Sequence, residues 1–151
     1  MRKEKSVNKR ILEVAAALFL AVAPVSAIAA PVTVSDGWFR ALPANLPSGG
    51  YFTLTNGGAA PMVLTGASSP ACGALMLHES ESTNGMAAMK DVMRIPVAPG
   101  ATLKFAPGGY HLMCMNPTSA MKPGASVSVT LQFADGKAVT GPFVVKNARG
   151  Q

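Results

Sequence analysis

Residues 126–146 read SVSVTLQFADGKAVTGPFVVK, a stretch that alternates between apolar and polar side chains. From Val127 to Phe133 every second residue is apolar, which is typical of a strand that buries one face. The Asp-Gly step at 135–136 then predicts a tight turn into a second strand, from Ala138 to Lys146. This stretch is therefore predicted to be an antiparallel β-hairpin.

Shorter runs of the same kind occur earlier in the chain, at 51–55, 62–65, 102–105 and 110–115, separated by glycine, proline or asparagine. No segment has a helical periodicity of useful length. Seven or eight strands at this spacing predict an all-β fold, an antiparallel β-sandwich of the immunoglobulin or cupredoxin kind. Residues 30–151 are enough for one hydrophobic core and too few for two, so we expect a single domain.

Residues 1–29 read as a secretory signal peptide rather than as part of that domain. Five basic residues lie in the first ten positions, an apolar run follows from Ala15 to Val25, and Ala27-Ile28-Ala29 offers a cleavage site. The apolar run is shorter than the roughly 20 residues of a spanning helix. We therefore expect an exported, periplasmic protein without a stable membrane anchor.

Removal of this leader lowers the net charge. It takes away five of the 13 basic residues and two of the seven acidic ones, which leaves eight against five and a net charge of about +3. The remaining basic residues are scattered along the sequence. Nothing in this pattern suggests a nucleic-acid surface.

Cys72 and Cys114 are the only cysteines of the chain. In an exported protein they are most simply a disulfide, because the compartment is oxidising; two free thiols are the alternative. On a strand, Cys114 would face away from the residue before it and so away from His111 and Met113.

The only two histidines stand at fixed distances from methionines. His111 and Met113 are two residues apart, so a strand would point both to one face. His78 is predicted to end a strand, and Met89 to adjoin the next after a polar segment. Imidazole nitrogen and thioether sulfur together are donors for a soft metal, first of all copper(I).

The sequence resembles the periplasmic copper chaperones called PCuAC, whose signature is His or Met, ten residues, Met, twenty-one residues, His, one residue, Met. This chain has His78, Met89, His111 and Met113 at that spacing, and the flanks from Gly50 to Asn56 and from Pro107 to Met113 also look like that family. The resemblance covers essentially the whole mature chain. It implies a metal site of these four residues that carries copper(I) and delivers it to a copper-accepting protein, the CuA centre of cytochrome c oxidase.

Four further methionines near this motif could provide additional thioether ligands. Met76 and Met115 are two residues from His78 and Met113 respectively, and Met86 and Met93 flank Met89. We treat these four as auxiliary candidates. The histidine-rich tail that could add a copper(II) site is missing from this sequence.

Other functions remain open at this point. The same site could buffer copper or confer resistance to it, and sequence does not separate storage from delivery. A blue-copper electron carrier would need a cysteine ligand, which the position of Cys114 does not supply. The hypothesis of a hydrolytic enzyme has still less support. Neither histidine lies in a nucleophile motif, and Glu79, Glu81 and Asp91 look solvated. We expect a monomer that is not an enzyme.

Overall fold

The computed structural model describes residues 31–43 and 46–151. The predicted signal peptide, residues 1–29, lies outside the described residues. The described part consists of strands and connecting turns, in the order β1 (Val32–Arg40), β2 (Ser48–Asn56), β3 (Met62–Ser68), β4 (Cys72–Thr83), β5 (Met86–Asp91), β6 (Ile95–Val97), β7 (Thr102–Phe105), β8 (Tyr110–Pro117), β9 (Ser126–Phe133) and β10 (Ala138–Lys146). Within these ranges, no helix has the length and apolar character needed to span a bilayer.

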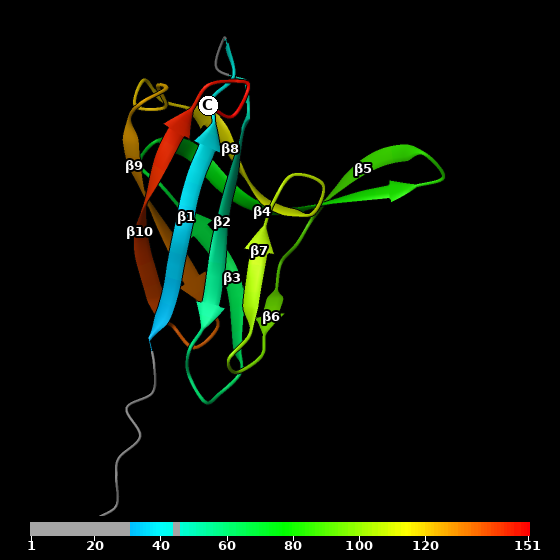
Figure 1. The fold of residues 1–151 in the computed structure, drawn as a ribbon, viewed down its shortest axis with the longest axis vertical. Helices are drawn as coiled ribbons and strands as arrows, with labels where there is room; N and C mark the ends of the chain where they lie inside the picture. The colour runs from blue at the N-terminus through cyan, green and yellow to red at the C-terminus, as the bar shows by residue number, and fades with distance from the viewer. Residues whose placement is uncertain (1–30, 44–45) are drawn as a thin grey trace, which may run out of the picture.

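The strands form one continuous hydrogen-bonded path, β5-β4-β8-β2-β1-β10-β9-β3-β6, with β7 paired to β2 beside it. This path folds over into two layers, and Figure 1 shows β10, β1, β2 and β7 in front of β9 and β3. The all-β sandwich predicted from sequence is confirmed. One pairing departs from the antiparallel pattern, because β1 and β10 run parallel, with Trp38 opposite Val144.

The hairpin predicted at the end of the chain is β9 and β10. Val129 pairs with Gly141 in an antiparallel register, and Gly136 in the turn has φ 83°. The apolar face of β9 is buried, with Val129 and Leu131 fully enclosed. The turn holds because glycine adopts a positive φ without steric cost.

Four phenylalanines form the centre of the core between the layers. Phe52 and Phe105 stack at 4.1 Å between ring centroids, and Phe143 lies 5.5 Å from Phe39 and 5.6 Å from Phe52. All four are at most 2% exposed. Because side chains alternate along a strand, burial of Phe39 turns its neighbours Trp38 and Arg40 to the outer face of β1.

Glycine at the start of β2 lets β8 approach closely. Gly50 pairs with Leu112, and a Cβ at Gly50 would lie 2.5 Å from Cε1 of Phe39 and 3.1 Å from Cβ of Leu112. No side chain fits there without displacement of the core. This contact fixes β8, which carries the second histidine, against β2.

The β4–β5 hairpin projects from the sandwich as an arm (Figure 1). Its turn is Asn84-Gly85, both with positive φ, at 53° and 78°. The expectation that β4 ends at His78 and that a loop leads to Met89 was wrong, because β4 continues to Thr83 and β5 starts at Met86. Asn-Gly favours a two-residue hairpin turn, and that local preference extends both strands to the turn.

Candidate metal site

The pairing of β4 with β8 brings the two histidines together. His78 lies opposite His111, and Met76 lies opposite Met113. Residues directly opposite in an antiparallel pair point to the same face. The two imidazole rings lie edge to face, with 5.6 Å between centroids.

The opposite face of the same two strands belongs to the core. Leu77 and Leu112 are paired there, and they are 5% and 0% exposed. Burial of these leucines fixes which face the histidines occupy, because a shift of one residue would exchange the two faces.

His111 is almost fully enclosed, at 5% exposure, and its ring is oriented by the backbone. Its Nδ1 lies 3.1 Å from the carbonyl oxygen of Gly109. A carbonyl only accepts, so Nδ1 carries the proton and donates it, which leaves the lone pair on Nε2. Histidines that bind metals are commonly held by such a bond from the other ring nitrogen.

His78 differs from His111 in its partners. Its Nε2 lies 2.8 Å from Oδ1 of Asp91, whereas its Nδ1 is buried and has no hydrogen-bond partner. Buried nitrogens without hydrogen bonds are uncommon in folded proteins and suggest an absent ligand. A metal ion would supply a partner for Nδ1.

Met89 reaches this face from the arm. It pairs with Ser80, two residues beyond His78, so it shares the face of His78. Its side chain is 62% exposed. Met89, His111 and Met113 line one open pocket of about 330 Å³.

His78 is not among the residues that line this pocket, but its ring lies against that of His111. The structure therefore gathers all four of the predicted residues on one face of β8, β4 and β5. In the described part of the chain no three histidine, cysteine, aspartate or glutamate side chains cluster as a metal would require. A metal at this place would depend on the thioethers.

The charged residues of the arm mostly lie on its other face. Lys90 pairs with Glu79 and also forms an ion pair with Glu81. These contacts, first that with Glu81 and then that with Glu79, raise the pKa of the Lys90 ammonium group above its usual range. Two of the three carboxylates expected to be solvated thus face away from the histidines.

Asp91 lies beside the site although it was expected to be solvated. Although 66% exposed, its carboxylate contacts His78. The signal was present in the Asn84-Gly85 turn, because a symmetric two-residue turn places residue 83 opposite 86 and, five pairs further along and on the other face, His78 beside Asp91. The same count places Ser80 opposite Met89.

Comparison with known proteins adds independent information. Residues 32–145 match the family model LpqE-like, described as "Putative lipoprotein LpqE-like". A relative from Leifsonia xyli subsp. xyli (strain CTCB07), "Putative lipoprotein Lxx21020", is 36% identical over 117 residues, which are 76% of this chain and 68% of the relative.

Solved structures agree with this assignment. The solution structure of CuI-DR1885 from Deinococcus radiodurans is 35% identical with a TM-score of 0.62, and the match covers 81% of this chain and 83% of that one. The chain belongs to the LpqE-like, or PCuAC, family. The copper-bound PCuAC domain from PmoF2 has a TM-score of 0.63 at 21% identity, over 77% of this chain and 92% of that domain, which shows the PCuAC fold alone.

The auxiliary methionines take different positions in this PCuAC fold. Met76 faces the site opposite Met113, and Met115 shares that face two pairs further along, opposite Ala74. Met86 pairs with Thr83 and points to the face of the arm away from Met89. Met93 follows β5 and is 78% exposed. Of the four, Met76 is the best placed to reach the histidines.

Cys72 and Cys114 form a disulfide that joins the start of β4 to the middle of β8. Cys114 is fully buried and lies on the core face, opposite Leu75. Its sulfur is therefore bonded and turned away from His111. The disulfide links the two strands whose register defines the site.

Proposed function

We propose that this protein is a copper(I) carrier that binds one ion through His78, Met89, His111 and Met113. The observation that carries this proposal is the cross-strand pair His78–His111, with one thioether from β8 and one from β5 on the same face. Two imidazoles and two thioethers form a neutral, soft donor set, which suits copper(I) better than zinc or iron. The copper in the related CuI-DR1885 supports the choice of metal.

The exposure of the donors fits release as well as binding. His111 is enclosed, whereas Met89 is 62% exposed on a projecting arm. An incoming ligand would displace Met89 first and the histidines later. Neutral thioethers also bind copper less tenaciously than thiolates, so the site favours transfer.

We propose export to the periplasm and delivery of the ion to the CuA centre of cytochrome c oxidase, acting as a monomer and without catalysis. The lipoprotein descriptions of the family and of the Leifsonia relative support an exported protein. The choice of acceptor follows from the resemblance of the motif. Copper buffering or resistance would use the same site and differ only in the absence of transfer.

The disulfide weighs against an electron-carrier function. A blue-copper site needs a cysteine thiolate among its ligands, and Cys114 is bonded to Cys72. The described chain has no free cysteine to take its place.

Anaerobic titration with copper(I) and X-ray absorption spectroscopy test the proposal. We expect one copper per chain with nitrogen and sulfur scatterers in equal number. Mixing of the loaded protein with the apo CuA domain, followed by separation and copper analysis, then distinguishes delivery from storage. Spectra with only nitrogen or oxygen scatterers would refute the site.

A further inference from the structure

A second surface adjoins the candidate metal pocket on the outer side of β1, β2, β7 and β10. We call it the basic aromatic face; it consists of Trp38, Arg40, Tyr51, Lys104 and Lys146. The rings of Trp38 and Tyr51 lie 4.7 Å apart, Lys146 Nζ lies 4.8 Å from the Trp38 centroid, and Arg40 Cζ lies 5.7 Å and 5.9 Å from the Trp38 and Tyr51 centroids. Cations at such distances are attracted to the ring faces, which orders both partners.

This face carries an excess of positive charge. A hollow of about 470 Å³ extends along it, lined by Trp38, Lys104 and Lys146, and Asp36 is its only carboxylate. Among the described residues, none of Arg40, Lys104 and Lys146 takes part in an ion pair. The Nε of Arg40 is buried and has no hydrogen bond.

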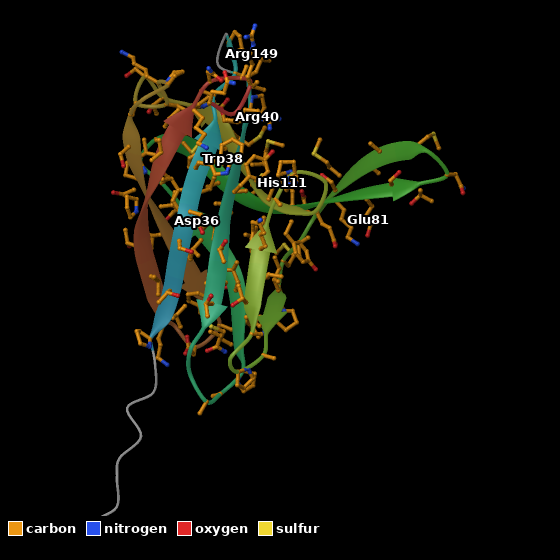
Figure 2. The ribbon with its side chains drawn as sticks, viewed as in Figure 1. Asp36, Trp38, Arg40, Glu81, His111 and Arg149 are labelled. Atoms are coloured by element: carbon orange, nitrogen blue, oxygen red, sulfur yellow. A yellow bond between two sulfur atoms is a disulfide. The ribbon has the colours of Figure 1, made fainter. Side chains whose placement is uncertain are left out.

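The basic aromatic face is continuous with the metal pocket. Arg40 and Tyr51 line that pocket together with His111. The ring centroids of Tyr51 and His111 are 6.5 Å apart. Figure 2 shows Asp36, Trp38 and Arg40 along β1, with His111 to the right of this row, a little below the level of Trp38. A partner that covers this face would therefore also stand at the mouth of the pocket.

We infer that the basic aromatic face docks an acidic surface of the copper-accepting protein, beside that protein's own copper site. This inference rests on the proposed function. Tryptophan, tyrosine and arginine are the residues that most often dominate binding at protein interfaces, and unpaired cations steer an acidic partner toward the patch. Docking here brings the acceptor's ligands to the exposed Met89 side of the pocket.

Charge reversal on this face provides the test. Lys104→Glu and the double variant Lys104→Glu/Lys146→Glu change two lysines that do not line the metal pocket. Lys137→Glu, in the exposed turn at the far end of β10, is the matched control; its lysine pairs only with the exposed Asp135. All three variants should bind copper(I) like the native protein, and thermal unfolding verifies that they fold.

The probe is the apo CuA domain of cytochrome c oxidase, and the readout is the second-order rate of copper transfer at low ionic strength. We expect the double variant to be slower by about tenfold and the single variant to be intermediate, while Lys137→Glu leaves the rate nearly unchanged. In about 1 M salt, where charges are screened beyond about 3 Å, the differences should disappear. Carbodiimide, which joins lysines to carboxylates in contact, should link Lys104 and Lys146 to the CuA domain.

Two different results would overturn the inference, and they distinguish a wrong docking face from a wrong acceptor. Equal transfer rates for all variants, with cross-links spread over Lys122 and Lys137, would reject the docking face and leave the carrier function intact. Copper binding without any transfer from the native protein would reject delivery to this acceptor and the docking face with it.

Discussion

His78 lies directly opposite His111 in the β4–β8 pairing, with 5.6 Å between their ring centroids. The two residues are 33 positions apart in the chain, so only the strand register brings them together. That register is fixed by two features, the leucines on the core face and the disulfide that joins β4 to β8. The close approach of β2 at Gly50 holds β8 in place on its other side.

Replacement of His111 or Met113 by alanine should weaken copper(I) binding. Each variant removes one donor of β8, and we expect the affinity to fall about tenfold or more, equivalent to about 1.4 kcal/mol. Competition against a chromophoric copper(I) chelator measures this. Met62→Ala on β3, away from the site, controls for the loss of a methionine. Full-strength binding by a His111→Ala/Met113→Ala double variant would contradict the assignment.

Loss of the disulfide should lower stability without removing a ligand. Cys72→Ala/Cys114→Ala opens a loop across 42 positions, and we expect the free energy of unfolding to drop by about 2–5 kcal/mol. Urea titration measures the drop. Copper(I) affinity, determined well below the unfolding midpoint, should change much less, because Cys114 lies on the core face of β8 and Cys72 packs against the same core. A thiol count of two in the unfolded, unreduced native protein would show that the disulfide is not formed.

Gly50→Ala should destabilise the domain where β2 meets β8. A Cβ at this position comes within 2.5 Å of the Phe39 ring, which is itself fully buried, so the core must shift at a cost of about 1–3 kcal/mol. Gly141→Ala on β10 is the control, since its nearest contact, Val34, is at an ordinary 3.6 Å. Equal unfolding midpoints for both variants would contradict this account of the β2–β8 contact.

The sequence predicted the sandwich because its strands alternate strongly, as in β9, and because Asp-Gly specifies a tight turn. It failed on the arm, where β5 is exposed at every residue and carries no burial signal. In the arm, only the Asn84-Gly85 turn defines which residues of β4 and β5 pair. His111 and Met113 could be placed on one face from their spacing, whereas the alignment of His78 with His111 depends on a long-range register. Local sequence does not encode that register.

Copper(I) should keep two sulfur ligands after the loss of Met89, because Met76 can take its place. Met76 lies opposite Met113, adjacent to the histidine pair, and its side chain is 38% exposed. Cross-strand neighbours have Cβ atoms about 4.5–5.5 Å apart, so two methionine side chains there can reach one ion. X-ray absorption on copper(I)-loaded Met89→Ala should therefore still show two sulfur scatterers. Met76→Ala/Met89→Ala should show only one. Met86→Ala, on the other face of the arm, should match the native spectrum. One sulfur in Met89→Ala alone would mean that Met76 does not replace it, and that copper loses a ligand as soon as the arm releases it.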